Sequence, residues 1–471
     1  MRDERTDALG MPTADMRRLG YWVVDRVVEH YERGPDGPAI RGGDAAELRG
    51  RLGGPVPQDP GDPMDALQEL VDVALFHMQH GDHPRYFARV PGPSSFAGVL
   101  GDWLGTGFNA LAASWGGGAG PAMVELVVLD WIRELLGMPV GTEGVILSGG
   151  SLSNLTGLAA ARHARGPGLA YLSDQTHASV RRGLEAIGFA PDDIRTLPTD
   201  DGFVLRAEVL ADAVRGDRAH GGRPQFVVAT AGTTNTGAVD ELDGIADVCA
   251  AEELWLHVDG AYGAPAALCP AGRGLLGGLE RADSVTLDPH KWLFAPYDCA
   301  ALLYRDPSLA KAVHTQDAAY LSVFRTTPRP PGQPPAGGRG GGEEPWNPTD
   351  YAFQLSRRSR GMPLWFSLAV HGIDAYRDAV EAAIATAREA AELVAATSYT
   401  ELVREPELSI VLFRRRGWTR ADYDVWSARL LADQIALCVP TTWEGEPTAR
   451  LALLHPETTL AIVQEVLDSM A

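Results

Sequence analysis

The chain has 471 residues, of which 45% are hydrophobic and 22% are charged, as in an ordinary soluble globular protein of two or three structural units. Its 41 basic and 62 acidic residues give a net charge of −21, which argues against binding to nucleic acid or to an anionic membrane surface. No apolar run reaches the roughly 18 residues that span a bilayer, the N-terminus does not resemble a signal peptide, and the four cysteines lack disulfide or CxxC spacing. We therefore expect a reduced, cytoplasmic protein.

The N-terminal part of the chain predicts helices. Apolar side chains recur at helical spacing over residues 15–33, and a Gly/Pro-rich connector over residues 50–63 leads to a second helical stretch that ends near His80. Helices that precede the first strand of a chain often wrap a partner subunit. We therefore predict that residues 1–80 form a helical segment that wraps the other subunit of a dimer.

From Gly144 onward, strand patterns and helix patterns alternate. Buried strands are predicted within "GVILSGG", "LAYLSDQTH", "QFVVATAGTT", "LWLHVDGAY", "SVTLDPH" and "CAALLYRD". This alternation predicts a mostly parallel α/β sheet with function at the strand ends, in a large domain over residues 81–373. Residues 374–471 then read as a small α+β domain. The low-complexity tract over residues 325–348 cannot build a packed core, and we predict a mobile lid over residues 320–350.

Lys291 in "DPHKWLF" is one of only two lysines in the chain. An arginine stays protonated, whereas a lysine in an apolar pocket can lose its proton and attack a carbonyl, as in enzymes that use pyridoxal 5′-phosphate (PLP). The alternative is a structural or surface lysine, and the residues alone leave both readings open. Lys311 in "PSLAKAVH" reads as a solvent-facing helix residue and provides the contrast.

A PLP site requires a phosphate cradle and an acid beside the pyridine nitrogen. "ILSGGSLSN" supplies a strand, two glycines, and Ser151 and Ser153 at a helix start, although such turns are common. No G-x-x-x-x-G-K-[ST] sequence supports a nucleotide site instead. Asp259 ends an apolar strand, where an unpaired acid is costly, so it is a candidate partner of the ring nitrogen or, alternatively, a helix N-cap.

Histidines offer further candidates. His177 follows a strand, where its ring could cover a cofactor, although a lone histidine is more often structural. The spacing of His77, His80 and His83 could suggest a metal ion, but no carboxylate or cysteine scheme accompanies it. We therefore expect no metal site.

The ordered set "SGGSLSNLTGLAAAR", "SDQTHASV", "ATAGTTNTG", "HVDGAY" and "DPHKWL…YDC" resembles the aromatic-L-amino-acid decarboxylase family, a branch of the group II PLP-dependent decarboxylases. The resemblance extends from about His83 to the "SRRSRG" segment. It implies PLP fold type I, with a mostly parallel seven-stranded sheet in the large domain. It also implies a homodimer with intertwined N-terminal segments and an amino acid as the substrate.

The resemblance implies a role for each matching residue. Lys291 corresponds to the Schiff-base lysine, Asp259 to the partner of the pyridine nitrogen, and His177 to the ring stacked on the cofactor. The other cofactor contacts that it implies are Ala261, Ser151, Leu152, Ser153, Thr234 and His290. Asp288 stands where animal relatives carry an asparagine that contacts phosphate, and an aspartate there would repel phosphate.

Tyr320 in "DAAYLSVF" matches a loop tyrosine that protonates the substrate carbon in family members, so it is the candidate catalytic acid. Related aldehyde synthases carry phenylalanine there. Tyr320, like the retained His177, therefore favours simple decarboxylation to an amine and CO2 over the alternative, oxidative decarboxylation to an aldehyde.

The substrate pocket departs from the family pattern. Positions that hold an aromatic clamp in animal relatives correspond to Gly81, Arg89 and Val90, and Trp115 is a candidate replacement for a pocket phenylalanine. An aromatic substrate such as Tyr, Trp, Phe or DOPA is favoured. Non-aromatic substrates of the diaminobutyrate, glutamate or valine type are the alternative, and a non-catalytic PLP-binding protein is a remote one. Arg357 matches an arginine that braces the active-site loops, and Asp240 is its expected partner.

Overall fold

The structure, a computed structural model, describes residues 9–33, 37–90, 92–316, 318, 321, 346–443 and 445–471, and all statements below concern these residues. Tyr320 and most of the predicted lid lie outside the described residues. None of the described helices is both long enough and apolar enough to cross a bilayer.

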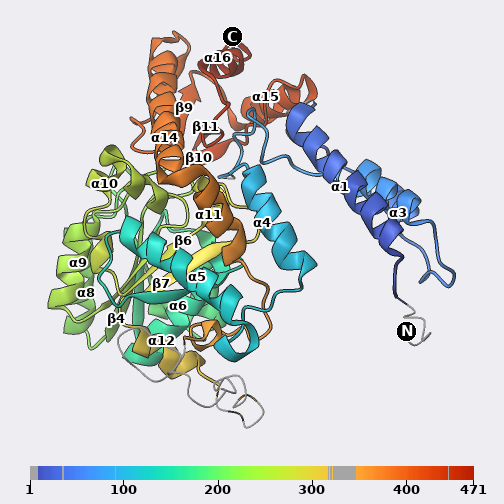
Figure 1. Ribbon diagram of the computed structural model, residues 1–471. Coiled ribbons are helices and arrows are strands. Elements are labelled where there is room, and N and C mark those ends of the chain that lie inside the picture. The colour runs from blue at the N-terminus through green and yellow to red at the C-terminus, as the bar shows by residue number, and fades with distance from the viewer. Residues whose placement is uncertain are drawn as a thin grey trace.

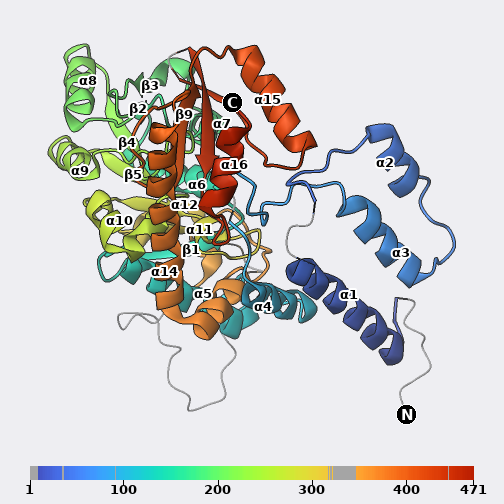
Figure 2. The same cartoon turned by 90° about the horizontal axis from the view of Figure 1, so that it is seen from above.

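An arm of short helices leads the chain. It contains α1 (Thr13–Arg33), α2 (Ala45–Leu52) and α3 (Pro63–Glu69), which continues into a π-helical turn at Leu70–Ala74. The arm projects from the body of the molecule, as both views show (Figures 1 and 2). The sequence reading missed α2, although Asp44 caps it by accepting hydrogen bonds from the backbone N–H groups of Ala46 and Glu47.

The large domain is built on a seven-stranded sheet in the order β1-β7-β6-β5-β4-β2-β3. The strands are β1 (Glu143–Leu147), β2 (Leu169–Ser173), β3 (Ile194–Leu197), β4 (Pro224–Thr230), β5 (Trp255–Asp259), β6 (Ser284–Leu287) and β7 (Ala300–Tyr304). Only β7 runs antiparallel to its neighbours, and the other pairs are parallel. The predicted mostly parallel, seven-stranded sheet is therefore confirmed.

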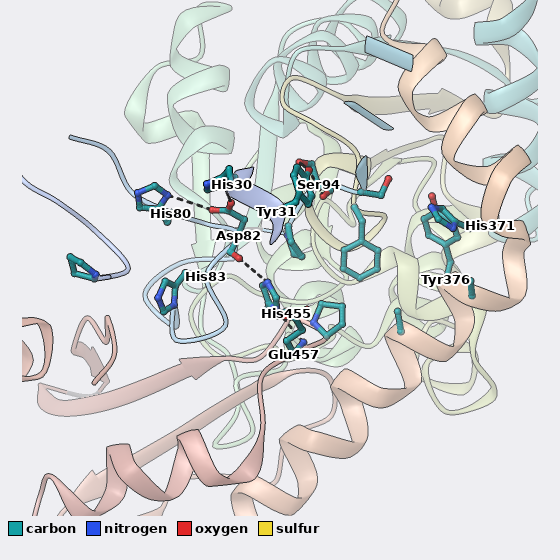
Figure 3. Close-up of a pocket in the computed structure, with 17 residues that line it drawn as sticks. His30, Tyr31, His80, Asp82, His83, Ser94, His371, Tyr376, His455 and Glu457 are labelled. Atoms are coloured by element: carbon teal, nitrogen blue, oxygen red, sulfur yellow. Dashed lines mark hydrogen bonds and ion pairs between the residues drawn. The ribbon is translucent and has the colours of Figure 1, made fainter. Parts of the chain in front are cut away.

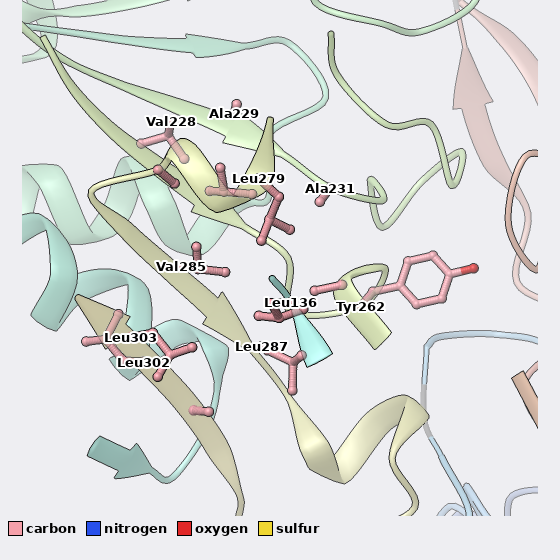
Figure 4. Packing of buried hydrophobic residues seen from close by; sticks show 14 of the residues in the cluster. Leu136, Val228, Ala229, Ala231, Tyr262, Leu279, Val285, Leu287, Leu302 and Leu303 are labelled. Atoms are coloured by element: carbon pink, nitrogen blue, oxygen red, sulfur yellow. The ribbon is translucent and has the colours of Figure 1, made fainter. Parts of the chain in front are cut away.

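Helices cover the sheet, and its central strands are mostly apolar because both of their faces are buried. The helices of this domain are α4 (Phe96–Gly107), α5 (Trp115–Leu135), α6 (Gly150–Arg165), α7 (Ala178–Ala186), α8 (Ala207–Ala219), α9 (Leu242–Ala251), α10 (Pro270–Leu275), α11 (Pro289–Trp292) and α12 (Pro307–His314). Helix α6 contacts five strands that are neighbours in the sheet: β1, β7, β6, β5 and β4. Figure 4 shows the core formed by side chains of neighbouring strands, including Val228, Val285, Leu287 and Leu302.

A long helix joins the large domain to the C-terminal part. Helix α14 (Gly361–Ala396) is interrupted at Gly372, which has φ 72°. It leads to an antiparallel sheet in the order β10-β11-β9-β8. The elements there are β8 (Thr400–Leu402), β9 (Ile410–Arg415), α15 (Arg420–Ala432), β10 (Thr441–Trp443), β11 (Glu446–Ala452) and α16 (Leu460–Asp468). The predicted boundary at residues 373–374 falls just after Gly372 and remains a prediction.

Candidate active site

A cavity of about 390 Å³ lies where the carboxyl ends of the parallel strands meet. Ligands bind at this edge in open α/β sheets because the loops that follow the strands converge there. The cavity brings together most of the predicted site residues: Ser151, Leu152, His177, Thr234, Asp259, Ala261, Asp288, His290 and Lys291. Ser153 is fully buried on α6 and does not line the cavity.

Lys291 lies on α11, the short helix that follows β6. Its Nζ atom is 2.9 Å from Oδ2 of Asp288, so the lysine stands beside an acid and not in the apolar setting that the sequence suggested. Burial by itself lowers the pKa of the Lys291 ammonium, but the charge and hydrogen bond of Asp288, followed by the charge of Asp259, outweigh burial and raise it. The ligand-free lysine is therefore held as an ammonium.

The backbone on one side of this lysine is closely packed. A Cβ atom at Gly92 would lie 1.6 Å from the carbonyl oxygen of Lys291, so no other residue fits at position 92 without moving the chain. On the other side, His290 donates from Nδ1 to the carbonyl of Cys299 at 2.6 Å, and its Nε2 lies 3.6 Å from Oδ2 of Asp288.

Asp259 is held by hydrogen bonds on both carboxylate oxygens. Its Oδ1 accepts from the backbone N–H of Ala261 at 3.2 Å, and its Oδ2 accepts from Nδ2 of Asn154 at 2.8 Å. The Asn154 Oδ1 atom in turn accepts from Nε2 of His257 at 3.1 Å, and Nδ1 of His257 lies 2.7 Å from the hydroxyl of Ser284. Four buried side chains thus form a chain that ends on the Asp259 carboxylate.

Sequence reasoning missed Asn154 and His257, although both leave a signal. Asn154 lies three residues after Ser151 on α6, so the two side chains point to the same side of the helix. His257 and Asp259 are two residues apart on β5 and therefore face the same side of the sheet. Burial lowers the pKa of His257 to about 4, so its ring is neutral at physiological pH.

The N-terminus of α6 faces Asp288. The N-cap residue, Gly149, provides no side-chain cap, which leaves backbone N–H groups of the first turn available to a ligand. A Cβ atom at Gly150 would lie 2.8 Å from Oδ2 of Asp288, so a side chain there would fill the space. Among the described residues, Oδ1 of Asp288 and Oγ of Ser153 are buried without a hydrogen-bond partner. The free backbone N–H groups and the space beside Gly150 fit an anionic group such as a phosphate, whereas the Asp288 carboxylate would repel it.

His177 and Thr234 border the cavity from other strand ends. Nδ1 of His177 accepts from the backbone N–H of Ser179 at 3.3 Å and lies 2.8 Å from the Ser179 hydroxyl, which leaves the proton on Nε2. The carbonyl of Thr234 accepts from Nη1 of the buried Arg450 at 2.6 Å. Tyr297, which the sequence reading did not single out, also lines the cavity, and its ring lies 4.9 Å from that of His290.

The three predicted substrate-pocket residues do not line this cavity in the single chain. Val90 is buried in the core, and Trp115 opens α5 with its backbone N–H donating to Oδ1 of Asn347 at 2.9 Å. Arg89 is exposed. Burial raises the pKa of Tyr297 at the cavity, and the charges of Lys291 and Arg89 oppose this rise only in part.

The expected pairing of Arg357 with Asp240 is wrong. Arg357 donates from Nη1 and Nη2 to the two carboxylate oxygens of Glu125 on α5, at 2.8 and 2.9 Å, and both side chains are fully buried. Asp240 instead accepts from the backbone N–H groups of Leu205 and Thr230, at 2.9 and 2.7 Å. Burial without a cation raises the pKa of Asp240 to about 7.

Comparisons with known proteins agree with this architecture. Residues 48–329 match the family model of the pyridoxal-dependent decarboxylase conserved domain. The chain is 35% identical over 477 residues to an aromatic-L-amino-acid decarboxylase of Bacillus atrophaeus, with 99% of this chain and 96% of that protein covered.

Among solved structures, it is similar to Oryza sativa TDC with PLP and tryptamine, at a TM-score of 0.88, and to Catharanthus roseus tryptophan decarboxylase in complex with L-tryptophan, at 0.86. Each is 26% identical, and the similarity covers 98% of both chains. The chain therefore belongs to the pyridoxal-dependent decarboxylases, and it is a PLP-dependent amino-acid decarboxylase with the α/β architecture of fold type I.

Proposed function

We propose that this enzyme removes the carboxyl group of an aromatic L-amino acid to give the amine and CO2, with PLP held in the Lys291 cavity. The observation that carries the proposal is that one cavity brings together the Lys291 amine, the Asp259 carboxylate and the N-terminus of α6. These three groups suit, in turn, the aldehyde, the ring nitrogen and the phosphate of PLP.

Each cofactor contact follows from this arrangement. Lys291 would hold the cofactor through its amine, and the first turn of α6, with Ser151 and Leu152, would hold the phosphate. His177 would cover one face of the ring and Ala261 the other. When bound, PLP supplies a protonated ring that accepts the electron pair released as the bond between Cα and the carboxylate breaks.

The chain's own groups would direct protons during this reaction. Asp259 keeps the ring nitrogen protonated, and the hydrogen bond from Asn154 holds its carboxylate in place. The Nε2–H group of His177 orients the substrate carboxylate. Tyr320, which lies outside the described residues, stays the proposed donor of the proton to Cα. Thr234 and His290 complete the cofactor pocket.

The aromatic substrate is proposed from the names of the relatives, which include aromatic-L-amino-acid and tryptophan decarboxylases. The Tyr297 ring at the cavity supports it, since aromatic rings pair well with aromatic rings. Arg89, Val90 and Trp115 are proposed to border the substrate once a second subunit is present.

We also propose a cytoplasmic homodimer in which residues 1–80, which include the arm, wrap the other subunit. The arm carries several exposed apolar side chains, which an interface would cover: Met16, Tyr21, Leu52, Val56, Leu70 and Phe76. Sedimentation of the holoenzyme and of a chain lacking residues 1–80 tests the dimer. Monomers of the full chain at micromolar concentration would contradict it.

A panel of amino acids given to the purified holoenzyme tests the reaction. Amine and CO2 in equal amounts are expected from Tyr, Trp, Phe or DOPA, and little product from glutamate, diaminobutyrate or valine. Aldehyde and peroxide that require oxygen would instead identify the oxidative route, and Tyr320→Phe should shift the product in that direction. Lys291→Ala should abolish both turnover and the absorbance of lysine-bound cofactor, whereas Lys311→Ala should leave both unchanged.

A further inference from the structure

A second cavity, of about 380 Å³, lies between the end of α1, the turn at residues 80–83, helix α14 and the loop after β11. It shares no lining residue with the Lys291 cavity. Five of the twelve histidines in the chain border it: His30, His80, His83, His371 and His455 (Figure 3). This concentration of imidazole groups lies outside the decarboxylation site.

Three of the side chains at this cavity converge on one point. The ligand atoms of His30, His80 and Asp82 all lie within 4.8 Å of one another. Nε2 of His30 is 2.5 Å from Oδ2 of Asp82, and Nδ1 of His80 is 3.8 Å from Oδ1 of Asp82. Figure 3 shows the two imidazole rings on either side of the carboxylate.

His80 adds a third possible metal ligand to the pair formed by His30 and Asp82. An ion pair between His30 and Asp82 does not involve His80. Nevertheless, Nδ1 of His80 points at the same carboxylate from 3.8 Å, which is too far for a hydrogen bond. Within the described ranges, neither ring nitrogen of His80 has a hydrogen-bond partner. Zinc ligands at about 2.0–2.1 Å in a tetrahedron lie roughly 3.4 Å apart, so shifts of under about 1 Å would bring all three atoms to the ion.

The backbone holds these ligands firmly. The turn at residues 80–83 is closed by a hydrogen bond from the N–H of His83 to the carbonyl of His80 at 3.1 Å. The carbonyl of Asp82 accepts from Nε2 of His455 at 2.8 Å, which anchors it to the C-terminal part. On the other side, the hydroxyl of Tyr31 donates to the carbonyl of Ser94 at 2.9 Å and fixes the end of α1.

We propose that His30, His80 and Asp82 bind one divalent transition-metal ion, Zn²⁺ by ligand type, with a fourth position open to the cavity. Two imidazoles and one carboxylate form a ligand set that this ion accepts. His30 belongs to the projecting arm, whereas the turn at residues 80–83 is anchored to the body through His455. The ion therefore fastens the arm to the body and takes no part in decarboxylation.

Titration of untagged, chelator-treated holoenzyme with Co²⁺ tests the site. One Co²⁺ per chain is expected, with visible ligand-field bands that Zn²⁺ displaces. His80→Ala and Asp82→Asn should each weaken binding by roughly a hundredfold or more, since loss of an outer hydrogen-bond partner alone costs about ten- to a hundredfold. Zn²⁺ should also slow release of the arm by a protease in the parent protein but not in His80→Ala.

Matched variants keep this test decisive. Two variants serve as controls. His371→Ala removes a histidine that borders the same cavity but lies outside the cluster, and His77→Ala removes a histidine whose Nδ1 already bonds to the carbonyl of Val73. Both should bind Co²⁺ as the parent does. His80→Gln replaces His80→Ala if the latter melts at a lower temperature. If all variants bound Co²⁺ equally, the ion would be an adventitious ion only. If the parent bound no stoichiometric Co²⁺, the cluster would be a His30–Asp82 ion pair. Either result overturns the proposal.

Discussion

Nζ of Lys291 lies 2.9 Å from Oδ2 of Asp288, an acid three residues earlier that also faces the N-terminus of α6. In the ligand-free chain, this carboxylate therefore balances the charge of the lysine ammonium, and it lies where the cofactor phosphate is expected. A bound phosphate would bring like charge to Asp288. Asp288 therefore attracts the lysine ammonium but would repel the phosphate.

Replacing Asp288 with Asn should lower the pKa of Lys291, because the opposing charge and the charge-assisted hydrogen bond are both lost while burial remains. Since the chain has only two lysines, NMR of protein with ¹³C-methylated lysines can follow each during a pH titration. Lys311, 3.7 Å from Glu143 and outside the Lys291 cavity, is the internal control, and its signals should be the same in both proteins. An unchanged Lys291 midpoint would show that Asp288 does not hold its proton.

Replacing Asn154 with Ala should lower kcat with little effect on KM. The Asp259 carboxylate would lose a hydrogen bond at 2.8 Å, and bonds to charged groups contribute about 1.5–3 kcal/mol, which corresponds to a roughly ten- to hundredfold loss of rate. Asn235→Ala is the control, because its side chain pairs with Thr441 and does not line the cavity. Equal kcat values for the two variants would remove Asn154 from a positioning role.

His257 should make the protein less stable in acid. Its pKa is lowered to about 4 in the folded chain from 6.5 in the unfolded chain, so the unfolded state binds the extra proton between these values. Its contribution to stability is complete above pH 6.5 and is lost as the pH falls toward 4. This loss amounts to about 3 kcal/mol.

Urea unfolding of the parent and of His257→Gln at several pH values measures this effect. Only the difference between the two proteins reports on His257, because His314 also has a pKa lowered to about 4 and Asp240 acts in the opposite sense between pH 3.8 and about 7. The stability difference should shrink as the pH falls from 6.5 to 4. A constant difference would mean that His257 does not titrate in this range.

Breaking the buried pair of Arg357 and Glu125 should destabilise the fold. Glu125→Gln leaves a fully buried guanidinium without its counter-charge, which costs about 3–5 kcal/mol. The neighbouring Arg358 pairs with Asp102 at the surface, so Arg358→Met should cost less than about 1 kcal/mol. Denaturant unfolding of both variants compares them, and similar losses would contradict the importance of burial.

Local sequence patterns predicted most strands of the large domain, because the formation of a buried strand depends mainly on the residues within it. Continuous apolar runs identified β1, β2, β4, β5, β6 and β7, and their ends identified the residues that converge on the cavity. Strand β3 was missed, since it is short and two of its four residues are only partly buried or exposed. Helix α2 was missed because Gly and Pro surround it.

Pairings between distant residues escaped prediction for a different reason. Arg357 and Glu125 are 232 positions apart, and spacing along the chain does not reveal which buried acid meets which base. The same holds for Asn154, which bonds to a residue 105 positions away. The apolar setting expected for Lys291 was wrong for a local reason, because Asp288, three positions earlier at the N-cap of α11, places its carboxylate beside the amine.

The antiparallel pairing of β6 with β7 gives the lysine a distinct place in folding. Leu287 pairs with Ala301, and the backbone N–H of His290 donates to Cys299 at 3.3 Å, so the loop that carries Lys291 closes on itself. Strand β5, which carries Asp259, and strand β2, which leads to His177, instead need parallel crossovers, whose longer loops cost more entropy to close. Pulse-labelled hydrogen exchange should therefore show protection of the β6–β7 hairpin before protection of β2 and β5. The active site is then assembled around a nucleophile that is already in place.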